Sequence, residues 1–96
     1  MKTKIVFKRS LGEKVVTYDT RQIAKNFIRI LKGEQKEHPE LELVDLYYPS
    51  DLNCYIENIL DKECDGNYFY EYDEDVEKLI EETVLDVDDL LTKHKS

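Results

Sequence analysis

The hydrophobic positions in the opening part of the chain predict a β-hairpin followed by a helix. Residues 4–8 and 14–18 are short runs of β-branched and aromatic side chains, which are typical of strands. Residues 10–13 separate them and supply hairpin turn chemistry. Apolar residues then recur at the spacing of one helical face from Ile23 to Leu31, with Asp19 or Thr20 as N-cap and Gly33 as the stop. We therefore expect a helix over residues 20–32.

The rest of the chain carries two more strand-like segments and two more helical ones. Residues 34–40 are polar and predict a loop, and residues 41–48 begin with alternating positions that favour a strand. Residues 52–60 show the most regular helical spacing, with Ser50 as N-cap and Gly66 as stop. Residues 67–72 alternate as in a fourth strand. A last helix is expected from Asp73, with a buried stripe of Val76, Leu79, Ile80, Thr83, Val84, Val87, Leu90 and Leu91.

This order of elements, ββαβαβα, predicts an α+β fold. We expect a mostly antiparallel sheet of three or four strands with helices packed on one face. The chain has 96 residues and no linker-like segment, so we expect a single domain over residues 1–96. No uninterrupted apolar run exceeds three residues, which predicts no membrane span, no signal peptide and a cytoplasmic location.

The charges are divided unevenly along the chain. Residues 1–36 hold ten basic and three acidic side chains, a net of +7, whereas residues 37–96 hold four basic and 19 acidic ones, a net of −15. The two parts together account for the formal net charge of −8. We expect one domain with a basic N-terminal part (1–36) and an acidic C-terminal part (37–96).

Few residues in the chain are candidates for catalysis or metal binding. His38 and His94 have no further ligand at zinc spacing, and the local sequence contains no Cys–His or Ser–His–Asp arrangement. We therefore expect neither an enzyme nor a cofactor. Residues 61–67 resemble the first half of an EF-hand calcium loop, with acidic side chains at Asp61, Glu63 and Asp65 before Gly66.

Tyr72 stands where such a calcium loop needs its bidentate glutamate. We therefore interpret residues 61–67 as a helix end with a glycine cap and expect no metal site. Weak calcium binding by the acidic loop 61–73 is kept as an alternative.

Basic side chains form a stripe on the first predicted helix. Arg21, Lys25, Arg29 and Lys32 follow at spacings of four, four and three residues, which places them on one face. Lys2, Lys4 and Lys8 share one side of the first strand. Such a surface can grip phosphates. The chain is acidic overall and no aromatic residue interrupts the stripe, so we expect a solvated face partly paired with the protein's own carboxylates, and no direct nucleic-acid binding.

The last predicted helix is rich in carboxylates on the faces that its apolar stripe leaves free. A helix rises about 1.5 Å per residue, and duplex DNA carries one phosphate charge per about 1.7 Å of its axis. A helix dense in carboxylates can therefore present a row of negative charge comparable with a stretch of phosphate backbone. Like charges one turn apart destabilise a helix by a few tenths of a kcal/mol per pair, so this density serves no need of the fold. A solubilising surface is the competing interpretation. The expected partner-binding residues are Tyr68, Tyr70, Tyr72, Asp73, Glu74, Asp75, Glu77, Glu81, Glu82, Asp86, Asp88 and Asp89.

In size and acidity the chain resembles the small anti-defence proteins of phages and mobile elements, which inhibit restriction or CRISPR nucleases. The resemblance implies an inhibitor that mimics DNA and occupies the cationic nucleic-acid groove of a nuclease. The partner is then a basic protein, and the chain itself is no enzyme. An immunity protein or antitoxin that neutralises a basic toxin would need the same surface. A nucleic-acid-binding regulator that uses the basic stripe is a third hypothesis, and a homo-oligomer is left open.

Overall fold

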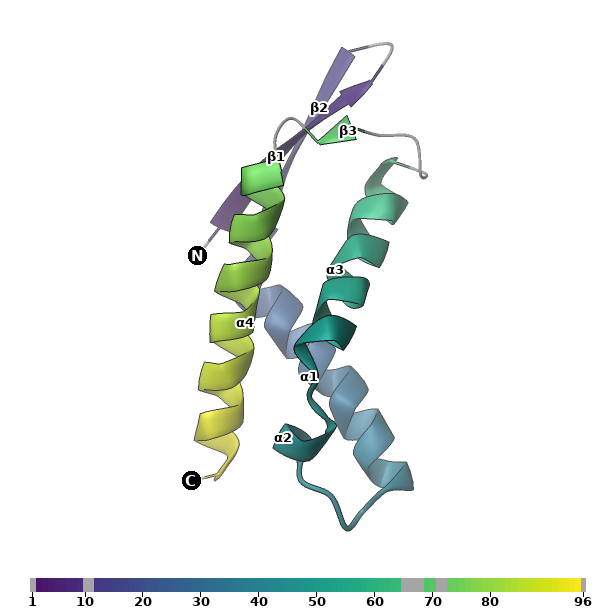
Figure 1. Cartoon of the computed structure of the whole chain (residues 1–96), viewed down its shortest axis with the longest axis vertical. Helices are drawn as coiled ribbons and strands as arrows, with labels where there is room; N and C mark the ends of the chain where they lie inside the picture. Colours follow the sequence, from purple (N-terminus) through teal and green to yellow (C-terminus); the bar gives the residue numbers. More distant parts are fainter. Residues whose placement is uncertain (1, 10–11, 65–68, 71–72, 96) are drawn as a thin grey trace.

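The computed structural model describes residues 2–9, 12–64, 69–70 and 73–95. The fold is α+β, with an antiparallel hairpin at one end and helices extending from it (Figure 1). The elements are β1 (Lys2–Arg9), β2 (Gly12–Asp19), α1 (Thr20–Glu37), α2 (Leu43–Leu46), α3 (Pro49–Cys64), β3 (Phe69–Tyr70) and α4 (Asp73–Lys95).

The hairpin has one buried face and one exposed face. β1 and β2 pair along their whole length, from Lys2 opposite Asp19 to Arg9 opposite Gly12. Gly12 has a φ of 128°, a conformation that favours glycine. Side chains alternate across a strand, so Thr3, Ile5 and Phe7 are buried against the helices while Lys2, Lys4 and Lys8 are exposed. The helices therefore cover one face of the hairpin.

The expected three- or four-stranded sheet is not confirmed, and neither is the ββαβαβα order. β1 and β2 are the two full strands, and β3 adds only Phe69 and Tyr70, which pair antiparallel with β1 in the order β2-β1-β3. The other residues of the expected strand 67–72 lie outside the described residues.

Residues 41–48 do not form the expected strand. They contain α2, flanked by extended backbone at Glu42 and Tyr47. The backbone N–H of Glu42 donates to the Asp45 carboxylate at 3.1 Å, and the Asp45 N–H donates to the Glu42 carbonyl at 3.0 Å. These local bonds close a helical turn. The spacing of half-buried Leu43, Leu46 and Tyr47 is also helical, whereas Val44 points outward.

Helix α1 is longer than expected, because Gly33 does not end it. The Asp19 carboxylate caps the N-terminus as predicted and accepts from the N–H groups of Arg21 and Gln22. A glycine inside a helix costs only about 1 kcal/mol, and residues 34–37 are strong helix formers. The helix ends at the C-cap His38, so the loop begins four residues later than predicted and covers residues 38–42.

The buried stripes of the two later helices follow the predicted spacing. In α3, Leu52, Ile56 and Leu60 are fully buried, and Pro49 begins the helix, where its missing N–H costs nothing. In α4, every described member of the expected stripe is buried or half-buried, namely Val76, Leu79, Ile80, Thr83, Val84, Val87, Leu90 and Leu91. The sequence pattern therefore identifies the core-facing sides of both helices.

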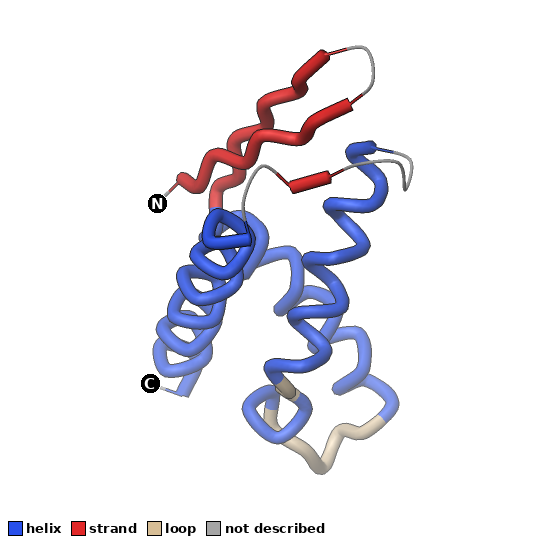
Figure 2. Tube along the Cα trace, turned by 45° about the horizontal axis from the view of Figure 1, so that its top comes forward, coloured by secondary structure: helices blue, strands red, loops and turns tan. Residues whose placement is uncertain are grey.

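The core lies where α1, α3 and α4 meet each other and the hairpin (Figure 2). The molecule is elongated, with extents of 50 × 24 × 17 Å. Its radius of gyration is 14.9 Å, against about 12.5 Å expected for a compact domain of this length. Among the described residues, no helix is both long enough and apolar enough to cross a bilayer.

Candidate functional site: the outer face of helix α4

The carboxylates of α4 fall into two groups with different environments. The first group faces the hairpin and the start of α1. The Thr3 hydroxyl donates to Glu82 at 2.7 Å, and the Thr20 hydroxyl donates to Asp86. Arg21 bonds Asp89 at 3.0 Å and lies 4.0 Å from Asp86. Three of the expected partner-binding carboxylates, Glu82, Asp86 and Asp89, therefore hold the fold together.

The second group lies on the outer side of α4, away from its buried stripe. It consists of four exposed carboxylates, which we call the acidic stripe: Glu74, Glu77, Glu81 and Asp88. None of the four side chains forms an ion pair with the described residues, although Lys78 lies on the same helix. The spacings of three, four and seven residues keep them on one face over about 21 Å of helix. The negative charge of the acidic stripe is therefore presented to solvent.

Leu85 is an exposed apolar side chain within this charged surface. Its exposed fraction is 64%, the largest among the large hydrophobic residues that the structure describes. Glu81 and Glu82 precede it by one helical turn, and Asp88 and Asp89 follow it by one turn, so carboxylates stand on both sides. An exposed apolar centre with a charged rim is the composition of a protein–protein interface. The sequence does carry a signal for Leu85, because it is out of phase with the buried stripe.

The structure places the other expected partner-binding residues as follows. Asp75 is half-buried in the first turns of α4. Tyr68 and Tyr72 lie outside the described residues, and the structure does not describe the side chains of Tyr70 and Asp73. The candidate site therefore rests on the acidic stripe and Leu85.

Asp88 connects the acidic stripe to the segment after α2. The Tyr47 hydroxyl is buried and has no hydrogen-bond partner among the described residues. Burial raises the pKa of Tyr47 above its ordinary value of 10.0, and the negative charge of Asp88 raises this pKa further. Phe27 meets the Tyr47 ring edge-on, with 6.1 Å between ring centroids, which holds Tyr47 against α1. Asp88 is therefore close enough to this part of the core to affect the pKa of Tyr47.

Helix α1 carries an exposed surface of opposite sign. Arg21 pairs with α4, as the sequence analysis expected for part of the basic stripe. Lys25, Arg29, Lys32 and Lys36 are exposed, form no ion pair within the described part of the chain, and follow at spacings of four, three and four residues. We call these four residues the cationic stripe. The protein therefore presents two helices whose outer faces carry opposite charge.

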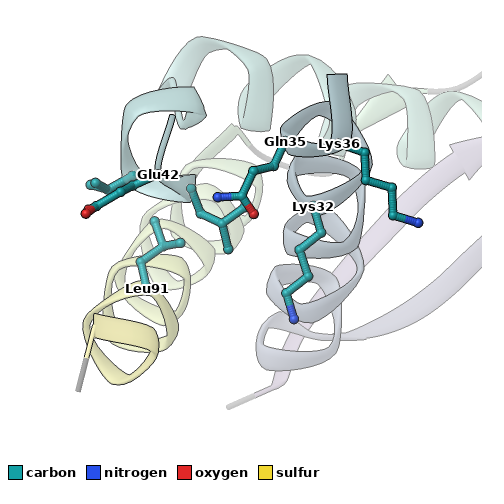
Figure 3. A pocket seen from close by; sticks show the side chains of 7 residues that line it. Lys32, Gln35, Lys36, Glu42 and Leu91 are labelled. Carbon is teal, nitrogen blue, oxygen red and sulfur yellow. The ribbon is translucent and has the colours of Figure 1, made fainter. Parts of the chain in front are cut away.

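An open groove of about 890 Å³ lies beside the C-terminal end of α1. α1 contributes Lys32, Gln35 and Lys36, the turn around α2 contributes Glu42, Leu43 and Val44, and α4 contributes Leu91. Gln35 reaches from α1 across the groove, and its amide donates to the Leu41 carbonyl at 2.8 Å (Figure 3). Neither lysine turns its ammonium group toward Glu42 (Figure 3). The sequence does not predict this groove, because the alternation at the start of residues 41–48 favours a strand where the structure has α2.

Part of segment 61–67, which resembles half of a calcium loop, contacts strand β2. Lys14 bonds both the carboxylate and the backbone carbonyl of Glu63, at 3.0 and 2.9 Å, which fastens the end of α3 to β2. Asp65, Gly66 and Asn67 lie outside the described residues. Within the described residues, no group of three or more histidine, cysteine, aspartate or glutamate side chains is arranged to hold a metal ion.

The three comparisons with known proteins, against family models, curated sequences and solved structures, find no match.

Proposed function

We propose that this protein is a non-enzymatic binding protein that places the acidic stripe of α4 in a cationic, nucleic-acid-binding groove of another protein. A nuclease is the expected partner, and the protein would inhibit it by excluding DNA or RNA. This is the mode of action of the small anti-defence inhibitors that the chain resembles in size and acidity. An immunity protein that blocks a toxic nuclease would use the same contact.

The observation that carries the proposal is the exposure of Leu85 between carboxylates. Burial of apolar area at the centre of an interface supplies most binding energy, and a charged rim steers the approach of the partner. Glu74, Glu77 and Glu81 repel one another along one face and form no ion pair within the part of the chain that the structure describes. Each such pair costs the isolated helix a few tenths of a kcal/mol. A cationic partner surface would add attraction to each carboxylate and so offset their mutual repulsion.

The structure changes which residues a test must alter. Reversing Glu82, Asp86 or Asp89 would break contacts that stabilise the fold, so the test alters only residues of the acidic stripe. The test variant combines Glu77→Lys, Glu81→Lys and Asp88→Lys. The matched control combines Glu34→Lys, Glu37→Lys and Glu57→Lys, which are exposed positions on α1 and α3. Both variants change the net charge by the same amount.

The experiment is affinity capture from a cell lysate, followed by competition on the captured protein. We expect the wild type and the control variant to capture a nucleic-acid-binding enzyme, and duplex DNA or RNA to release it. The stripe variant should lose capture, and binding should fall steeply with salt because charged contacts are screened. Equal capture by both triple variants, or capture that neither salt nor nucleic acid reduces, would overturn the proposal.

The cationic stripe of α1 supports a second candidate function. Arg21 is paired with α4, as expected for part of the basic stripe, and Lys25, Arg29, Lys32 and Lys36 are exposed without ion pairs among the described residues. Such a row can contact a phosphate backbone. A gel-shift assay with DNA and RNA tests this function. A complex that Lys25→Gln with Arg29→Gln abolishes would support a nucleic-acid-binding regulator, and no shift at low salt would exclude it.

A further inference from the structure

The groove beside α1 combines a cationic side with an apolar floor. Lys32 and Lys36 lie one helical turn apart on one side, and Leu43, Val44 and Leu91 supply apolar surface. Among the described residues, Glu42 is the single acidic side chain in the lining, and Figure 3 shows it on the side away from the lysines. A ligand that fits this groove needs an apolar group with negative charge on its flanks.

The openness of the groove favours a protein surface over a small molecule. Of the lining side chains that the structure describes, Leu91 alone is buried, and Lys32, Lys36, Glu42 and Val44 are all exposed. Small-molecule sites enclose most of the ligand surface, which an open groove with exposed walls does not achieve. A helix laid along the groove would instead bury one face and leave the other in water.

We propose that this groove binds the acidic stripe of a second copy of the protein, with Leu85 on the apolar floor. Leu85 is 64% exposed and has Glu81 and Asp88 one turn to either side. Those two carboxylates are seven residues apart, a rise of about 10.5 Å along the helix. The groove lining contributes two cations, Lys32 and Lys36, which lie one turn apart on α1. The cations of the groove and the carboxylates beside Leu85 therefore match in sign, and each set lies along one face of a helix.

The geometry of this contact determines how copies assemble. The groove and the acidic stripe are different surfaces, so the contact is heterologous and joins copies head to tail into a ring or an open chain. The net charge of −8 on each copy opposes association. Screening beyond about 8 Å at physiological salt leaves the close, complementary charges to decide the outcome. Exposed ion pairs are individually weak, so association should be weak and concentration-dependent.

This inference uses the acidic stripe but needs no partner protein, and it stands or falls separately from the proposed function. The groove variant, Lys32→Glu with Lys36→Glu, leaves the acidic stripe intact. It should lose self-association and still capture a partner through α4. Self-association would then compete with partner binding, because both use the same face of α4.

Sedimentation of the full chain over a range of concentrations tests the proposal. The wild type should sediment faster as its concentration rises at low salt, and this dependence should disappear at high salt. The groove variant and a double variant of the acidic stripe, Glu81→Lys with Asp88→Lys, should each weaken association by about tenfold or more. The matched control, Lys4→Glu with Lys25→Glu, has the same net charge as the groove variant but changes exposed positions outside the groove, and it should associate like the wild type.

The decisive sample is an equimolar mixture of the groove variant and the double variant of the acidic stripe. The acidic groove of the first can bind the basic stripe of the second, and the unaltered stripe of the first can bind the unaltered groove of the second, so mixing should restore the association that each variant alone has weakened. Circular dichroism confirms that each variant is folded. A wild type that remains monomeric at all concentrations, a control variant that weakens as much as the groove variant, or a mixture without recovery would each overturn the proposal.

Discussion

The Thr20 hydroxyl donates a hydrogen bond to the Asp86 carboxylate and thereby joins the first turn of α1 to the middle of α4. Thr20 is fully buried, and the Asp86 side chain is only 13% exposed. Arg21, the next residue of α1, lies 4.0 Å from Asp86 and bonds Asp89. A carboxylate that the sequence assigns to partner binding therefore fixes how two helices pack.

Removal of the Asp86 carboxylate should destabilise the fold. Asp86→Ala leaves the buried Thr20 hydroxyl without this acceptor, and a lost hydrogen bond to a charged group costs about 1.5–3 kcal/mol. Urea unfolding measures the change. Glu77→Ala is the control, because Glu77 is exposed on the same helix, and its effect should stay within about 0.5 kcal/mol. Equal effects of the two substitutions would contradict the role assigned to Asp86.

Truncation of two leucines of α4 should affect stability to very different extents. Leu79 is fully buried and Leu85 is 64% exposed. Leu79→Ala should lower the free energy of unfolding by about 2–5 kcal/mol, because it leaves a cavity in the core. Leu85→Ala should change it by less than about 0.5 kcal/mol. Thermal or urea unfolding of both variants checks this, and a large loss at Leu85 would show that its side chain serves the fold.

Tyr47 should make stability depend on alkaline pH. Its pKa is raised in the folded protein, first by burial and then by Asp88, so the folded state holds the phenol proton more tightly than the unfolded state does. The resulting stabilisation is complete below the unfolded pKa of about 10 and is lost as the pH rises through the higher folded pKa. Urea unfolding at successive alkaline pH values should show this loss.

Two variants isolate the contribution of Tyr47. Tyr47→Phe should remove this part of the alkaline loss. At neutral pH it should also raise the unfolding free energy by about 1 kcal/mol, since the buried hydroxyl has no partner among the described residues. Asp88→Asn should lower the pKa of Tyr47, as read from phenolate absorbance. An unchanged pH profile in Tyr47→Phe would refute this assignment.

The N-cap of α1 should contribute measurably to stability. The Asp19 carboxylate accepts from Arg21 N–H at 3.1 Å and from Gln22 N–H at 3.4 Å. Asp19→Ala should lower the unfolding free energy by about 1 kcal/mol, whereas Asp19→Asn should retain most of the capping. Chemical unfolding compares the two. If alanine and asparagine are equally destabilising, charge rather than capping explains the effect.

Local sequence patterns predicted the structure correctly wherever a segment interacts mainly with its neighbours in the sequence. The hairpin, the Asp19 cap and the buried stripes of α3 and α4 all follow from spacing that a single element enforces. The strand prediction for residues 41–48 was wrong. A short alternation of apolar and acidic residues is compatible with a strand, but hydrogen bonds between Glu42 and Asp45 close a turn of helix there. The predicted end of α1 at Gly33 was wrong because one glycine does not outweigh the helix-forming residues after it.

The candidate site likewise has features that the sequence predicts and features that only tertiary packing decides. The sequence alone determined that α4 concentrates its carboxylates on the sides that its apolar stripe leaves free, since helical periodicity assigns residues to faces. It could not determine which of those faces meets the hairpin. Tertiary packing decided that Glu82, Asp86 and Asp89 lie beside Thr3, Thr20 and Arg21, and that Glu77, Glu81 and Asp88 remain in solvent around Leu85. The physical reason is that these contacts join residues more than sixty positions apart, which no local pattern encodes.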